Sequence, residues 1–302
     1  MDLLLFDHRG RFLRQIGTKG EGPDDYLFFN DVVYEEKTGL IYAHERYRNQ
    51  IYTYDLSGKL VGKTSRGKYS FNSFCKTPEG FWVYSCFKGE NNPEGYNLML
   101  LDDDLQLRKA AYFPQKAFIN AVFSSTFTYD EKGVPYFYYP TSNVLYRLEG
   151  TKACAALEID FGNKTLPYPA IARMSTFDEY EKLLSGQTYF TGINQVKVRD
   201  SVFYFTFMES GENVAVNAYF CLFDAARSQS KIYAHPFIDH SEYPVSSGLL
   251  AFGAGKMIYA LYPMTIDEKC LPFTFENVLF PVDAESNPVL VVFERRQAGG
   301  SR

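Results

Sequence analysis

The sequence predicts an all-β fold: a six-bladed β-propeller of four-stranded antiparallel blades, with short helical insertions on one face and an incomplete first and last blade. Three observations favour it. The 302 residues include 24 Tyr and 27 Phe but one Trp, and Tyr and Phe fit half-buried pleated surfaces. A motif of two strands around a tight turn recurs at a nearly constant spacing. The expected turns hold Gly or Asp, the residues that a β-hairpin needs there.

The recurring motif is an apolar strand that ends in Asp, then a polar turn and a second strand. Its copies are Leu5–Phe12, Thr53–Leu60, Leu100–Leu105, Leu145–Gly150 (where Arg147 replaces Asp) and Leu222–Arg227. The steps from Asp7 to Asp55, Asp102, Arg147 and Asp224 are 48, 47, 45 and 77 residues. The first three match the period of roughly 40–50 residues of a propeller blade, and the fourth is one period plus an insertion of about thirty residues.

Further strands between these motifs complete the blades. The expected hairpins are Phe29–Tyr34 with Leu40–Ala43, Phe71–Lys76 with Phe81–Cys86, Phe123–Tyr129 with Val134–Tyr139, Gln195–Val198 with Ser201–Phe207, and Gly248–Phe252 with Lys256–Leu261. A last strand, Val289–Phe293, follows Pro288. We therefore expect one propeller domain at residues 1–296, with a partial blade at 1–16, blades at about 29–64, 70–113, 122–160, 190–234 and 246–294, and a frayed tail at 297–302.

Composition and spacing argue against several classes of function. The formal net charge of -5, from 31 basic and 36 acidic side chains, argues against a nucleic-acid partner. No apolar run approaches the ~18 residues of a transmembrane helix. The five cysteines lack metal-ligand or disulfide spacing and are expected to be small buried hydrophobes. His8, His44, His235 and His240 form no metal-ligand motif, and neither a metal nor a cofactor is expected. Gly17–Pro23 lacks the ending of a phosphate-binding loop.

A resemblance to a known family appears at Arg11–Tyr26, where an apolar strand is followed by three glycines, a proline and the pair Asp25-Tyr26. This segment resembles the inter-blade signature of the six-bladed β-propeller proteins of bacterial cell envelopes, relatives of the NHL-repeat propellers, although Asp25 stands where the family usually has Glu. Asn287–Leu290 resembles the family's last strand. The resemblance implies an exported, often lipid-anchored protein whose N-terminal strand closes the last blade.

Residues 1–10 resemble neither such a leader nor that closing strand. We therefore expect the chain to begin downstream of its natural start. The expected location is the periplasm or cell envelope if a leader precedes the chain, and the cytoplasm for the chain as it stands.

Long loops are expected on one face. In a propeller, the loops between second and third strands share a face with the loops between blades. The long segments belong to these two classes: Gly17–Phe28, Lys88–Gly95, Phe161–Tyr189, Met208–Asn217 and Tyr262–Ser286. Loops of this length are uncommon unless functional or disordered. A binding face is therefore predicted at the mouth of the central channel.

Two of the long segments are expected to contain short helices. Thr176–Glu179 has the pattern of a capping box and opens the run Phe177–Leu184, with Gly186 where a helix would stop. Thr265–Glu268 repeats the pattern more weakly. Such helices either plug the channel or cover a blade edge, or they form a mobile lid over a ligand.

The candidate ligand-binding residues all lie on the predicted binding face: Asp25, Tyr26, Arg46, Tyr47, Arg48, Tyr139 and Tyr189. Arg46 and Arg48 flank an aromatic side chain, and guanidinium pairs suit carboxylate, sulfate or phosphate groups. A salt-bridged rim loop is the alternative. The aromatic faces would suit sugar rings or peptide aromatics. No residue is expected to be catalytic.

We expect a non-enzymatic binding module for a small molecule (an oligosaccharide, a peptide or an anion) or for a protein partner. One alternative is a propeller hydrolase or lyase that acts on a carbohydrate or peptide at the central channel. It would need two titratable groups that converge on inner strands, and Asp31 has no evident partner. The other alternative is a purely structural scaffold.

Overall fold

The computed structural model describes residues 2–7, 11–85, 92, 95–114, 126–139, 142–171, 173–211, 218–234, 249–253, 256–261, 273–275, 278–280 and 289–294. The chain divides into two compact units. The first comprises Met1–Thr128 and Pro135–Glu158, and the second Tyr129–Val134 and Ile159–Arg302. No helix among the described residues has the length and apolarity required to span a membrane.

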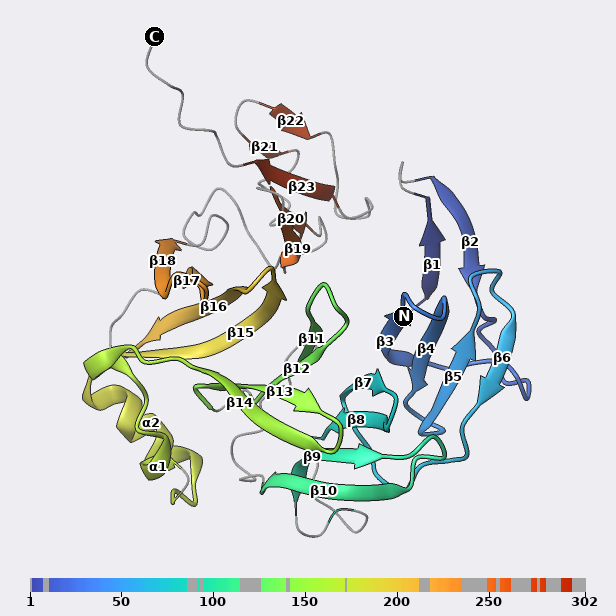
Figure 1. Ribbon diagram of the computed structural model, residues 1–302, viewed down its shortest axis with the longest axis horizontal. Helices are drawn as coiled ribbons and strands as arrows, with labels where there is room; N and C mark the ends of the chain where they lie inside the picture. Colours follow the sequence, from blue (N-terminus) through green and yellow to red (C-terminus); the bar gives the residue numbers. More distant parts are fainter. Residues whose placement is uncertain are drawn as a thin grey trace. The chain divides into compact units, whose positions relative to one another are not determined.

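Four sheets are four-stranded antiparallel meanders in which the strands pair in chain order (Figure 1). Their strands are β3 (Phe29–Glu35), β4 (Leu40–Glu45), β5 (Gln50–Tyr54) and β6 (Leu60–Lys63); β7 (Ser73–Thr77), β8 (Gly80–Tyr84), β9 (Tyr96–Leu101) and β10 (Leu107–Pro114); β11 (Phe127–Tyr129), β12 (Pro135–Tyr138), β13 (Val144–Glu149) and β14 (Lys152–Glu158); and β15 (Tyr189–Arg199), β16 (Val202–Ser210), β17 (Ala218–Asp224) and β18 (Gln229–Ala234). The predicted β class and the blade-like sheets are confirmed, whereas the count of six blades stays a prediction.

The remaining described strands form smaller sheets. They are β1 (Leu3–Phe6) with β2 (Phe12–Ile16), β19 (Leu249–Gly253) with β20 (Lys256–Leu261) and β23 (Val289–Glu294), and β21 (Phe273–Phe275) with β22 (Val278–Phe280). The hairpin of β21 and β22 lies inside Tyr262–Ser286, which the sequence analysis assigned to a loop. Its two strands consist of aromatic, β-branched and leucine residues, which favour extended structure.

The Asp of the repeated motif has a structural role. It lies at the turn between the third and fourth strands, and its Oδ1 accepts hydrogen bonds from main-chain N–H groups of that turn. Asp55 accepts from Ser57 and Lys59 at 2.8 and 3.1 Å, and Asp102 accepts from Asp104 and Gln106, both at 2.9 Å. A side chain that satisfies the turn in this way explains why Asp recurs at this position in most copies of the motif.

The core of the sheet β3–β6 is aromatic. The rings of Tyr26 and Phe29 stack with centroids 4.0 Å apart, and Phe29 meets Tyr52 and Tyr54 edge-on at 6.1 and 6.2 Å. All four side chains are almost completely buried. Ile16 of β2 joins the same cluster, so the sheet β1–β2 packs on the core of the sheet that follows it.

The second unit carries the helical insertion. η1 (Gly162–Lys164), α1 (Tyr168–Ile171) and α2 (Phe177–Gly186) separate β14 from β15. The predicted capping box is confirmed: Thr176 Oγ1 accepts from the Glu179 N–H, and the Glu179 side chain accepts from the Thr176 N–H. The helix includes Gly186, where the sequence analysis expected it to stop. Thr265–Glu268 lies outside the described residues.

Strand β15 is longer than expected because its ladder is irregular. The sequence analysis placed its start at Gln195, but pairing begins at Tyr189 and shifts register twice before Lys197. Gly192 and Gln195 have positive φ values of 63° and 51°. Bulges of this kind break the alternation of apolar and polar residues on which strand prediction depends.

The cysteines follow the prediction in part. Cys75 and Cys221 are buried, while Cys154 is partly buried. Cys86 and Cys270 lie outside the described residues.

Candidate functional site

The candidate site lies at one end of the sheet β3–β6. There β4 passes into β5 through the turn Arg46–Asn49, and the loop Gly17–Phe28 enters β3. The Arg46 N–H donates to the Phe28 carbonyl oxygen at 3.1 Å. The inter-blade loop and the second-to-third-strand turn therefore lie at the same end of this sheet, as expected for a propeller blade.

A buried carboxylate fixes this turn. The Glu45 side chain is 0% exposed; its Oε1 accepts from the Phe28 N–H at 3.1 Å and its Oε2 from the Arg48 N–H at 2.6 Å. Main-chain donors satisfy a buried carboxylate without an opposite charge. Glu45 thus joins the inter-blade loop to the turn and is not available to a ligand.

A histidine and an asparagine support the turn from below. His44 is buried, and its Nε2 lies 3.1 Å from Asn49 Oδ1. Its ring stacks on Phe71 with centroids 3.8 Å apart. Burial lowers the pKa of His44 to about 4, so the ring is neutral at physiological pH. His44 is a core histidine; His8, His235 and His240 lie outside the described residues.

Arg48 binds the protein's own main chain. Its Nη1 donates to the Asp25 carbonyl oxygen at 2.6 Å and to the Tyr52 hydroxyl at 2.8 Å, and its Nη2 donates to the Gly22 carbonyl oxygen at 3.3 Å. Lys63 holds the same loop through the Pro23 carbonyl oxygen at 2.6 Å. Arg48 is therefore a structural clamp rather than a ligand-binding side chain.

Asp25 and Tyr26 also stabilise the loop Gly17–Phe28. Asp25 Oδ2 accepts from the Gly22 N–H at 3.0 Å, and a Cβ atom at Gly20 or Gly22 would lie 2.5 or 2.7 Å from that oxygen. Tyr26 is 0% exposed, and burial raises the pKa of its hydroxyl. The glycines of this segment thus give room to Asp25, and Tyr26 belongs to the core.

Arg46 and Tyr47 are the candidate residues that the turn presents outward. Both are exposed, Tyr47 to 68%. The Tyr47 ring meets Phe28 edge-on with centroids 6.4 Å apart. An exposed aromatic side chain on an anchored turn offers apolar surface to a ligand. Because the turn is already fixed, little conformational entropy is lost when the ligand binds.

The other two aromatic candidates lie on or next to other sheets. Tyr139 follows β12 in the first unit and is partly buried. Tyr189 is 6% exposed, as the first residue of β15 in the second unit. Most of Lys88–Gly95 and of Tyr262–Ser286, and residues 212–217, lie outside the described residues.

A further loop lies at this end of the sheet and was not among the predicted site segments. Residues 64–72 connect β6 to β7, and the loop 64–70 forms the first part of this connection. Asn49 Nδ2 donates to the carbonyl oxygens of Gly67 and Tyr69 at 2.8 and 2.9 Å. Arg66 and Lys68 of this loop are exposed. The loop is too short to stand out by length, but two cations beside a tyrosine in an inter-blade position were a readable signal.

Asp31 on β3 is the titratable group that the alternative of an enzyme would use. Its Oδ2 accepts from the Phe74 N–H at 2.9 Å and its Oδ1 from the Val32 N–H at 3.0 Å. Burial raises the pKa of this carboxyl to about 7. His44 is its register partner on β4, but the ring nitrogen of His44 interacts with Asn49. The contacts of Asp31 tie β3 to β7.

No group of three or more His, Cys, Asp or Glu that could hold a metal ion occurs within the part of the chain that the structure describes.

Comparisons with known proteins agree on the fold. The family described as "Domain of unknown function (DUF4934)" matches residues 1–294. The crystal structure of the "Putative exported protein (BF0058)" from Bacteroides fragilis superimposes with a TM-score of 0.71 at 14% identity, over 98% of this chain and 85% of that chain. A member of the DUF4221 family from Bacteroides vulgatus gives a TM-score of 0.53 at 10% identity, over 97% of this chain and 86% of that chain. None of the curated proteins matches the sequence.

Proposed function

The chain belongs to the DUF4934 family, and we propose that it is a non-enzymatic ligand-binding β-propeller whose recognition element is the turn that carries Arg46 and Tyr47. The ligand is a small molecule with a flat or apolar face and an anionic group. Tyr47 contacts the face, and the Arg46 guanidinium binds the anion.

One observation carries this proposal: a tyrosine that is 68% exposed stands on a turn whose two sides are anchored. On one side the buried Glu45 accepts hydrogen bonds from the Phe28 and Arg48 N–H groups. On the other, Asn49 donates to two carbonyl oxygens of the loop 64–70. Rigid support of an exposed side chain is what a binding site needs, because a preorganised site loses less conformational entropy when the ligand binds.

In this proposal residues 1–296 form one six-bladed propeller of the NHL-like type. The four-stranded meanders and the recurring Asp turns support it. The sheet β1–β2 contributes two strands to a blade. Asp25, Tyr26 and Arg48 act as the frame of the site.

We also propose a location in the periplasm or cell envelope. The resemblance of Arg11–Tyr26 to envelope propellers supports this location, as does the name of BF0058, which places that protein among exported proteins.

A thermal-shift screen of the purified chain against oligosaccharides, peptides and small anions tests the binding function. We expect a ligand that raises the midpoint of the wild-type chain and fails to do so for Arg46→Ala and Tyr47→Ala. At a hundredfold excess over Kd, binding to the folded state adds about 2.7 kcal/mol of stability.

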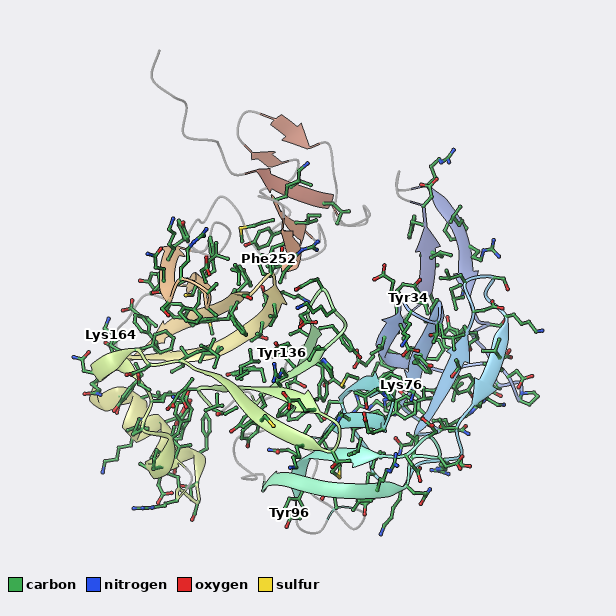
Figure 2. All side chains as sticks on the ribbon, viewed as in Figure 1. Tyr34, Lys76, Tyr96, Tyr136, Lys164 and Phe252 are labelled. Carbon is green, nitrogen blue, oxygen red and sulfur yellow. The ribbon has the colours of Figure 1, made fainter. Side chains whose placement is uncertain are left out.

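Tyr34→Ala is the matched control. Tyr34 is 50% exposed and lies near the opposite end of β3 (Figure 2). Its variant should respond to the ligand as the wild type does. A ligand that stabilises all four proteins equally would exclude this turn from the site.

A further inference from the structure

We propose that the turn Arg46–Asn49 and the loop 64–70 form one basic and aromatic strip that binds a carboxylated oligosaccharide. This inference rests on the proposed binding function. It names the ligand class and adds three residues to the site: Arg66, Lys68 and Tyr69. The strip is defined by Arg46, Tyr47, Arg66, Lys68 and Tyr69.

The two segments are joined rather than merely adjacent. Asn49 Nδ2 donates to the carbonyl oxygens of Gly67 and Tyr69, and the Gly67 N–H donates back to the Asn49 carbonyl oxygen at 2.8 Å. Gln50 Nε2 donates to the Thr64 carbonyl oxygen at 2.8 Å. These four hydrogen bonds, all made by Asn49 and Gln50, hold the loop against the turn, so the two segments keep a fixed relative position.

The strip is positive although the chain has a formal net charge of -5. Arg46, Arg66 and Lys68 are exposed. Within the described residues, neither Arg66 nor Lys68 forms an ion pair with a carboxylate. A local excess of cations attracts an anionic ligand regardless of the overall charge.

Three carboxylates at this end of the sheet are already engaged. Glu45 accepts from main-chain N–H groups, Asp25 accepts from the Gly22 N–H, and Asp24 pairs with Lys63 at 2.9 Å. These three carboxylates therefore do not neutralise Arg66 or Lys68, whose charges attract an anionic ligand.

The aromatic rings select the ligand class. Tyr47 is 68% exposed, and Lys68 Nζ lies 5.6 Å from the centroid of the Tyr69 ring. A uronic-acid residue offers an apolar pyranose face to a tyrosine and a carboxylate to a guanidinium, which binds it in a bidentate manner. An acidic peptide supplies carboxylates without a flat ring, and inorganic sulfate or phosphate would use the cations alone.

Isothermal titration of the full chain with tetragalacturonate tests the inference, with a neutral galactose tetrasaccharide and poly-glutamate as comparison ligands. We expect tetragalacturonate to bind more tightly than both, and its affinity to fall as salt is added, because exposed charges are screened. The double variant Arg66→Ala/Lys68→Ala should bind it about tenfold more weakly, which corresponds to about 1.4 kcal/mol.

The control variant Lys37→Ala/Lys59→Ala removes the same charge from exposed positions at the other end of the sheet. It should retain wild-type affinity. An equal loss of tetragalacturonate affinity in both double variants would show that only the net charge of the protein matters, and it would overturn the proposal that the strip is the binding site. Tighter binding of poly-glutamate would overturn the ligand class.

The outcomes also separate this inference from the function on which it rests. If the neutral tetrasaccharide binds in a Tyr47-dependent manner and tetragalacturonate does not, the turn stands as a binding site, but the anionic group given to the ligand in both proposals is wrong. If Tyr47→Ala and Arg46→Ala change the binding of no ligand, including those of the broader screen, the proposed function fails as well.

Discussion

The Arg48 guanidinium donates a hydrogen bond of 2.6 Å to the main-chain carbonyl oxygen of Asp25. These two residues are 23 positions apart, one on the turn after β4 and the other in the loop before β3. The bond converts a glycine-rich loop into a fixed part of the blade. It also separates two arginines that look equivalent in the sequence: Arg48 holds the frame of the site, and Arg46 is presented to solvent.

Arg48→Ala should therefore destabilise the fold. It removes three charge-assisted hydrogen bonds, two of them to carbonyl oxygens. Hydrogen bonds to a charged group are stronger than those between neutral groups, so we expect a measurable loss of stability in urea unfolding. Arg46→Ala, at an exposed position, should stay within about 0.5 kcal/mol of the wild type. Equal losses for the two variants would contradict the distinction.

Glu45→Gln tests the buried carboxylate. Each Glu45 oxygen accepts a hydrogen bond from a main-chain N–H group. Glutamine has only one acceptor oxygen, so its amide NH2 group would face one of these two N–H donors. We expect a loss of about 1–3 kcal/mol in unfolding free energy, the cost of an unsatisfied buried polar group. Glu36→Gln, at an exposed position of the turn between β3 and β4, is the control and should be close to neutral. An unchanged Glu45→Gln protein would show that these bonds do not anchor the turn.

The repeat was predictable because the residue that produces it acts locally. Asp55 and Asp102 accept hydrogen bonds from N–H groups within four positions along the chain. The pattern can therefore be recognised from the sequence alone. The capping box of α2 is local in the same sense.

The roles of Tyr26 and Arg48 were not predictable in this way. Sequence places both on a loop at the correct end of the blade, and the fold then buries Tyr26 against Phe29 and turns Arg48 onto main-chain carbonyl oxygens. Whether an arginine meets a ligand or its own main chain depends on contacts from residues far away in the sequence. The two cations of the loop 64–70 are visible in the sequence, but its link to the turn runs through Asn49, and this link was not predictable.

Gly17 should tolerate no side chain. Gly17 and Gly39 have nearly equal φ values of 72° and 69°, so alanine meets the same left-handed strain of roughly 1–2 kcal/mol at both positions. A Cβ atom at Gly39 would meet nothing within 4 Å, whereas at Gly17 it would lie 2.8 Å from the Tyr54 hydroxyl oxygen. Gly17→Ala should therefore cost about 1–3 kcal/mol more than Gly39→Ala in urea unfolding. Equal costs would mean that Tyr54 moves aside freely.

Asp31 and His44 should give opposite contributions to the pH dependence of stability. The pKa of Asp31 is raised to about 7, so the folded state retains a proton that the unfolded state has lost. Stability from this group is greatest below an unfolded pKa of 3.8 and decreases as pH rises to about 7. The pKa of His44 is lowered from 6.5 to about 4, so its contribution is present above pH 6.5 and is lost as pH falls toward 4.

In the wild type, Asp31 and His44 change the unfolding free energy with pH in opposite directions between about pH 4 and pH 7. Asp31→Asn carries no charge at any pH, and its side-chain oxygen still accepts from the Phe74 N–H. Removal of the Asp31 titration leaves the His44 slope uncompensated, because the unfolded state then takes up protons that the folded state does not bind. We expect Asp31→Asn to lose stability on acidification from pH 7 to pH 4 more steeply than the wild type, as measured by urea unfolding at four pH values. Asp55→Asn, at a carboxyl whose pKa is lowered rather than raised, should not steepen the slope. Parallel pH profiles for Asp31→Asn and the wild type would show that Asp31 is ionised in the folded protein throughout this range.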